Sequence, residues 1–243
     1  NTNNKSINNK DIKTKEKKPE LGIYIHIPFC IKKCYYCDFI SFSDKFDIQN
    51  KYIEKIKEEI QAQKHIMEKY DITTIYIGGG TPSSIESKKI IEILEEILNK
   101  DKNVKVNNKE ITIEVNPGTV TKQKLEDYKE AGINRISIGL QTTNNKLLKN
   151  IGRIHNLEDF EKTYNLIKEI GFKNINVDLM IGLPNQTIED IKQSIEKIVN
   201  LTPKPKHISV YSLIIEENTP FEKMLEENKV SLPSDEEERT QYH

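Results

Sequence analysis

The chain has 243 residues, with 37 Lys and Arg residues against 38 Asp and Glu residues, so its formal net charge is -1. This length is enough for one substantial domain with a hydrophobic core, and the charge balance gives no electrostatic reason to expect nucleic acid or an anionic membrane as a partner. No apolar run approaches the ~18 residues of a membrane span, no secretory signal pattern is visible, and the unpaired cysteines favour the reducing cytoplasm as the compartment.

The first twenty residues are rich in Asn and Lys and contain almost no apolar side chains. Such a segment cannot bury enough surface to order itself, so we expect a flexible polar tail over residues 1–20. We expect one core domain over residues 21–232, and we interpret residues 233–243 as the start of a truncated C-terminal region. Because the chain begins with Asn1 and stops within a helix-like stretch, we expect it to be a fragment of a longer protein.

All three cysteines lie within eight residues, at Cys30, Cys34 and Cys37. Their number is odd and the loop is short, so they are not expected to form a set of disulfides, and metal is the natural ligand. Structural zinc usually takes four ligands from paired knuckles, whereas a lone C-x3-C-x2-C triplet suits an iron–sulfur cubane with one iron left open. The alternatives are a zinc site completed by His26 or His155, and reactive free thiols.

Strand-like runs alternate with segments of helical period along the rest of the chain. The runs are expected at residues 22–29, 73–79, 110–117, 135–141, 174–182 and 207–214. The clearest helix follows Thr187, which has Asp190 three residues on, as in a capping box. Six strand–helix repeats imply a parallel sheet with right-handed crossovers. A closed eight-fold barrel needs a longer chain, so we predict an α/β fold, an open six-fold (β/α)6 partial TIM barrel, with a doubly wound sheet as the alternative.

The predicted strands have one apolar face and one polar face. In the third run, Thr112, Glu114 and Asn116 alternate with aliphatic residues, and the following runs repeat this pattern. Parallel strands covered on both faces normally read as continuous apolar runs. The alternation therefore predicts that the sheet curls around a polar ligand. The alternative is a solvent-exposed face, although such faces usually carry more Lys and Glu.

The unusual local strings follow the C-terminal ends of the strands, where parallel α/β folds place their chemistry. The second run ends in the string GGGTP at residues 78–82, whose glycines let a ligand approach the main chain closely. Glu114, Gln141 and Asp178 share the polar face, and Arg153 follows the fourth run. A buried carboxylate needs a cation or several donors, and Arg153 suits bidentate pairing with a carboxylate. Taken singly, each is more often a structural hydrogen-bonding residue, but together they favour a nucleoside-like cation as ligand.

The string YIHIPFC-x3-CYYCDF at residues 24–39 resembles the signature of the radical S-adenosylmethionine (SAM) enzymes. Within them it resembles the branch that contains the oxygen-independent coproporphyrinogen III oxidases and the HemW-type haem chaperones. The resemblance implies a radical SAM core in which Cys30, Cys34 and Cys37 hold a 4Fe–4S cluster whose open iron chelates SAM. By motif position it also implies SAM contacts from Tyr24, Tyr36, Gly79, Gly80, Thr81, Glu114, Gln141, Arg153 and Asp178.

One position separates the two kinds of protein in this branch. The oxidases carry a further Cys where this chain has Phe39, so the chain resembles the haem chaperones. Those proteins bind haem through a downstream His-Asn-x-x-Tyr-Trp string, and this chain contains no Trp, so haem binding rests on resemblance alone.

The resemblance implies SAM, haem or a porphyrinogen, an electron donor such as flavodoxin or ferredoxin, and a haem-acceptor protein as partners, and no nucleic acid. The alternatives are a coproporphyrinogen III oxidase or a related radical SAM porphyrin enzyme, and a binding module whose cluster only governs partner exchange. Whether SAM is cleaved stays open.

Overall fold

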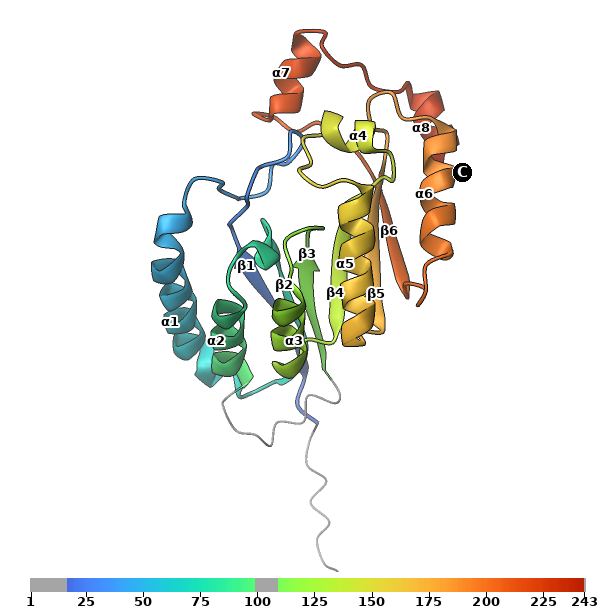
Figure 1. The fold of residues 1–243 in the computed structure, drawn as a ribbon. Helices are drawn as coiled ribbons and strands as arrows, with labels where there is room; N and C mark the ends of the chain where they lie inside the picture. Colours follow the sequence, from blue (N-terminus) through green and yellow to red (C-terminus); the bar gives the residue numbers. More distant parts are fainter. Residues whose placement is uncertain (1–16, 99–108, 243) are drawn as a thin grey trace, which may run out of the picture.

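The structure is a computed structural model that describes residues 17–98 and 109–242. Six parallel strands form one sheet in the order β1-β2-β3-β4-β5-β6, and β1 and β6 do not pair with each other (Figure 1). The strands are β1 (Glu20–Ile27), β2 (Asp71–Gly79), β3 (Glu110–Val115), β4 (Arg135–Gln141), β5 (Asn174–Ile181) and β6 (His207–Ser212). The predicted open six-fold partial barrel is therefore confirmed.

Several predicted strand ends differ from the observed ones. β1 begins and ends two residues earlier than expected, since Pro28 has no N–H to continue the ladder. β3 stops at Val115, two residues before Pro117. The predicted polar tail lies mostly outside the described residues, and the part that is described already enters β1 at Glu20.

Helices follow the strands and cover one face of the sheet, with α1, α2, α3 and α5 lying side by side (Figure 1). The helices are α1 (Gln49–Met67), α2 (Ser87–Leu98), α3 (Lys122–Glu130), α4 (Asn145–Asn150), α5 (Leu157–Ile170), α6 (Ile188–Val199), α7 (Pro220–Glu226) and α8 (Asp235–Tyr242). Short 3-10 helices, η1 and η2, span Phe46–Ile48 and Pro82–Ser84. Within the described ranges, no helix is long and apolar enough to cross a membrane.

The capping box predicted before α6 is confirmed. The Thr187 side chain accepts a hydrogen bond from the Asp190 N–H at 3.1 Å, and the Asp190 carboxylate accepts one from the Thr187 N–H at 2.8 Å. These two bonds satisfy N–H groups that have no partner within the helix, so the local sequence alone specifies where α6 begins.

The aliphatic face of the sheet packs under the helices and forms the main core, in which Ile111, Ile136 and Ile175 are fully buried. The other face is also buried on the central strands, since Thr112 and Asn176 expose only 1% and 2% of their surface. On the central strands the polar face is thus an inner wall, whereas on the two edge strands Tyr24 and Tyr211 are 59% and 40% exposed.

A second hydrophobic cluster lies at the C-terminal end of the sheet, where α4 and α7 sit above the strand ends (Figure 1). Its buried members include Ile151 and Phe221, and Tyr35 and Tyr36 of the cysteine loop pack against it. This cluster fixes one side of the cysteine loop over the polar inner wall.

Candidate functional site

The loop that carries the cysteines connects β1 to α1 and is held by main-chain hydrogen bonds on both sides. Cys30 N donates to Phe42 O at 3.0 Å, which pins the start of the loop to its return. Tyr35 N donates to Ile151 O at 3.1 Å, and Tyr35 O accepts from Phe221 N at 3.0 Å. The protein chain itself therefore fixes the shape of the loop.

His26 ties β1 to the same loop. Its Nε2–H donates to Ile40 O at 2.7 Å, and its Nδ1 accepts from the Tyr24 hydroxyl at 3.1 Å. Gly79 lies against this ring with φ of 117°, and a Cβ at that position would come within 2.7 Å of the imidazole. Only glycine suits both conditions, and His26 is a hydrogen-bonded structural residue.

The zinc alternatives find no support in this geometry. Both nitrogens of His26 are engaged, and Nε2–H of buried His155 donates to Leu140 O at 3.3 Å. Burial, with the nearby Arg153 charge, lowers the pKa of His155 to about 3, so this ring is neutral. A neutral ring can ligate a metal, so it is the spacing of the groups that disfavours zinc. In the described part of the chain, no three His, Cys, Asp or Glu side chains gather as a site for a single metal ion. A cluster in which each thiolate binds a different iron does not need them so close.

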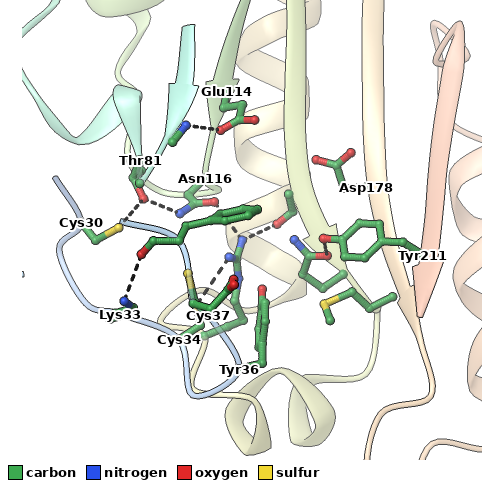
Figure 2. Close-up of a pocket in the computed structure, with 18 of the residues that line it drawn as sticks. Cys30, Lys33, Cys34, Tyr36, Cys37, Thr81, Glu114, Asn116, Asp178 and Tyr211 are labelled. Atoms are coloured by element: carbon green, nitrogen blue, oxygen red, sulfur yellow. Dashed lines mark hydrogen bonds between the residues drawn. The ribbon is translucent and has the colours of Figure 1, made fainter. Parts of the chain in front are cut away.

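A cavity of about 300 Å³ opens beside the loop at the C-terminal ends of the strands (Figure 2). All three cysteines line it and all three are free thiols. Of the nine residues predicted to contact SAM, eight also line this cavity: Tyr36, Gly79, Gly80, Thr81, Glu114, Gln141, Arg153 and Asp178. Tyr24 does not, since it is 59% exposed and its ring stacks on Tyr76. The topology thus brings together nearly every residue that the motifs predicted.

Two carboxylates, those of Glu114 and Asp178, lie on the inner wall of this cavity. Glu114 accepts from the Tyr76 hydroxyl at 2.8 Å and from Gly79 N at 3.2 Å. Asp178 accepts from Asn176 Nδ2 at 2.7 Å. Burial raises the pKa of both carboxyl groups despite these donors. Among the described residues neither forms an ion pair, so a cationic ligand would supply the missing charge.

Arg153 lines the same cavity, next to Cys34. Its Nη2 donates to Asn116 Oδ1 at 2.9 Å and to Gly139 O at 2.7 Å, and its Nη1 approaches Cys34 Sγ at 3.6 Å. The pairing with a carboxylate that we expected is not made within the described chain. Arg153 Nε is buried with no hydrogen-bond partner among the described residues, although the side chain lines the cavity.

Two tyrosines supply aromatic surface to the same cavity. Tyr36 lies between two of the cysteines, and the Tyr211 hydroxyl donates to Gln141 Oε1 at 2.7 Å. Gln141 has φ of 71°, an uncommon conformation for a residue with a side chain, and it lies at a register shift between β4 and β5. Backbone strain of this kind is concentrated at binding sites.

Asn116 and Tyr211 also line the cavity, although neither is among the predicted site residues. Both lie on the polar faces of predicted strands, and this position is the feature of the sequence from which they could have been identified. The cavity lining also includes Lys32, Lys33, Asp38, Phe39, Val115, Ser137, Gly139, Met180, Ser212, Ile214 and Glu216.

Comparison with known proteins gives consistent matches. The family model described as the radical SAM superfamily matches residues 24–198. The heme chaperone HemW of Haemophilus influenzae is 43% identical over 210 residues, covering 84% of this chain and 54% of that protein. The heme chaperone HemW of Bacillus subtilis is 37% identical over 222 residues, covering 90% and 57%. The chain thus spans about half the length of these curated relatives.

Among solved structures, coproporphyrinogen III oxidase (HemN) from Escherichia coli, described as a radical SAM enzyme, is similar to this chain. The TM-score is 0.76 at 26% sequence identity, and the match covers 91% of this chain and 50% of the other. The curled six-stranded sheet is therefore shared with that enzyme.

Proposed function

This chain belongs to the radical SAM superfamily, which implies a 4Fe–4S cluster and SAM as cofactors, and from that premise we propose that it is the radical SAM domain of a haem chaperone. In this proposal the domain binds the cluster and SAM, and the whole protein delivers haem to acceptor proteins. The identity to two HemW proteins supports the proposal. So does Phe39, which stands where the resembling oxidases carry a further cysteine.

Cys30, Cys34 and Cys37 would hold the cluster through their thiolates. The fit rests on three free thiols that line one cavity from a loop whose shape the chain itself maintains. The bound cluster supplies one-electron chemistry and an iron that is open to an exogenous ligand. The side chains around it bind and orient that ligand and exclude water.

The single observation that carries SAM binding is a pair of carboxylates that line the cavity, have pKa values raised by burial and form no ion pair with another described residue. SAM carries a sulfonium, an ammonium, a carboxylate, two ribose hydroxyls and a flat base. We assign the cationic groups to Glu114 and residues 79–81, and the ribose hydroxyls to Asp178. Arg153 would donate to an acidic group, and Tyr36 would pack against the base.

Anaerobic reconstitution with iron and sulfide tests this assignment. We expect about four irons per chain in the wild type and loss of the cluster in Cys34→Ala. Ser43→Ala, on the exposed part of the same loop, is the matched control and should retain the iron. Stoichiometric zinc with no iron uptake, or full iron content in Cys34→Ala, would contradict the proposal.

The similarity to the E. coli oxidase makes a porphyrinogen oxidase the second candidate. Full-length protein should be incubated with SAM, reductant and porphyrinogen, and separately with haem and an acceptor protein. Release of 5′-deoxyadenosine in proportion to oxidised porphyrinogen would identify an oxidase. Haem transfer without such release would identify a chaperone. If neither occurs, the cluster serves a binding module.

The remaining partners follow from the same proposal. A cluster that takes up single electrons needs a one-electron donor, for which we propose a flavodoxin or a ferredoxin. Three free thiols suit a reducing compartment, so we propose the cytoplasm.

A further inference from the structure

A continuous chain of side-chain hydrogen bonds joins two of the three cysteines (Figure 2). The Thr81 hydroxyl donates to Cys30 Sγ at 3.5 Å, and Asn116 Nδ2 donates to Thr81 Oγ1 at 2.9 Å. On the other side, Arg153 Nη2 donates to Asn116 Oδ1 at 2.9 Å, and Arg153 Nη1 approaches Cys34 Sγ at 3.6 Å. Asn116 stands at the centre, two bonds from each sulfur.

The direction of every bond in this chain follows from the chemistry of Arg153. A guanidinium can only donate, so the amide atom of Asn116 that faces it is the oxygen. The amide nitrogen therefore faces Thr81 and donates to its oxygen. A hydroxyl has one proton, and with its oxygen accepting from Asn116, that proton is directed to Cys30. Asn116 thus sets which way the Thr81 hydroxyl points.

The rest of the fold holds these side chains in place. Thr81 is 5% exposed, and its N–H donates to Phe29 O at 2.8 Å. Asn116 N donates to Ser83 Oγ at 3.2 Å. At Gly139, an added Cβ would come within 2.9 Å of Arg153 Nη2 and 3.3 Å of Asn116 Oδ1, so the close approach needs glycine.

The third cysteine stands outside this network. Cys37 has a main-chain donor, from Phe39, and in the described part of the chain no side chain donates to its sulfur. The network therefore distinguishes two thiolates from the third.

We propose that Asn116 is a positioning residue that acts through Thr81 and Arg153 to set the hydrogen bonds on Cys30 and Cys34, and through them the reduction potential of the cluster. The inference rests on the proposed function, because it requires a cluster at these cysteines. Donors to cluster sulfurs stabilise the reduced, more negative state and raise its potential. Outer-shell partners of this kind orient the ligands and tune the metal.

The isosteric substitution Asn116→Asp tests the direction of the bonds. A carboxylate can still accept from Arg153, but it also attracts the Thr81 proton, so Cys30 loses its donor. Thr81→Val removes the same donor directly, and Thr81→Ser keeps the hydroxyl. In reconstituted full-length protein, we expect Asn116→Asp and Thr81→Val to shift the reduction equilibrium by about tenfold toward the oxidised cluster, about 59 mV for one electron. Thr81→Ser should match the wild type.

The double variant separates an effect through Thr81 from a mere change in charge. If Asn116 acts by orienting the Thr81 proton, Thr81→Val causes no further shift in the Asn116→Asp background. Asn145→Asp, which makes the same charge change at an exposed residue of α4, should leave the potential unchanged. Iron content, the electron paramagnetic resonance spectrum of the reduced cluster and the melting temperature of the apo-protein are measured for every variant.

The outcomes distinguish this inference from the proposed function. Equal shifts from Thr81→Val in both backgrounds, or a wild-type potential in Thr81→Val, would overturn the role of Asn116 while leaving the cluster assignment intact. A wild-type protein that takes up no iron would overturn both. Should Asn116→Asp fail to fold, the contrast between Thr81→Val and Thr81→Ser still decides whether this donor tunes the cluster.

Discussion

Glu114→Gln is the substitution that most directly tests the electrostatics of the cavity. Glutamine keeps the length and shape of the side chain and removes its charge. In the wild type this carboxylate accepts from Tyr76 and Gly79 but has no cation partner among the described residues. Burial raises the pKa of Glu114, so keeping this carboxyl group ionised costs free energy. A bound cation would offset that cost.

The structure gives the expected magnitude for ligand binding and for stability. A contact to a charged group contributes about 1.5–3 kcal/mol, so SAM should bind about 10- to 150-fold more weakly to Glu114→Gln. The free energy of unfolding of the apo-protein should change by less than about 1 kcal/mol, because the charge removed has no partner. Weak binding with retained stability is the signature of a binding carboxylate.

The pH dependence of SAM binding follows from the direction in which the pKa of Glu114 is shifted. A raised carboxyl pKa means that the folded protein favours the protonated form, so stability is lost as pH rises through the folded pKa. The sulfonium of SAM stays positive throughout. Wild-type affinity should therefore increase as pH rises through the raised pKa of Glu114 and the carboxyl group ionises. In Glu114→Gln, SAM affinity should rise less with pH, because only Asp178 still ionises beside the ligand. The pKa of Asp178 is also raised by burial.

Calorimetric titration of anaerobic, reconstituted protein measures these affinities across pH. Glu110→Gln is the matched control, with the same charge change at the exposed start of β3, where Glu110 lies 3.9 Å from Arg135. Wild-type SAM affinity in Glu114→Gln at every pH would refute the reasoning. Equal weakening in Glu110→Gln would also do so.

Four further substitutions test how the fold is held together. Gly79→Ala adds a Cβ within 2.7 Å of the His26 ring at φ of 117°, and it should lower the free energy of urea unfolding by about 1–3 kcal/mol; unchanged stability would show that the turn relaxes at no cost. Thr187→Ala removes the capping box of α6 and should cost about 0.5–2 kcal/mol in the same assay, whereas Asp190→Asn, which keeps an acceptor, should cost less. Tyr128→Phe removes a buried hydroxyl that has no partner in the described part of the chain, so the melting temperature should stay level or rise, and a clear fall would reveal an unseen partner.

Local sequence determined much of this protein. Helix and strand periods, proline and glycine positions and the box at Thr187 and Asp190 act over a few residues, so they can be read without the fold. The spacing of the cysteines and the polar face of the strands likewise predicted a cluster loop above a hydrophilic wall. Parallel strands then bring their C-terminal ends to one edge, which explains why residues as far apart as Cys30 and Asp178 line one cavity.

Only the tertiary structure decided which of these side chains touch. Thr81, Asn116 and Arg153 follow three different strands, and no sequence period reports that their polar atoms meet at 2.9 Å. The position of Tyr24 was also decided by the tertiary structure. The motif predicts Tyr24 at the site, but it lies on edge strand β1 and is largely exposed. Hydrogen-bond direction depends on the curvature of the sheet and on ångström-scale distances between distant segments. The sequence therefore determined which groups reach the cavity, and the packing of the barrel determined how they are paired there.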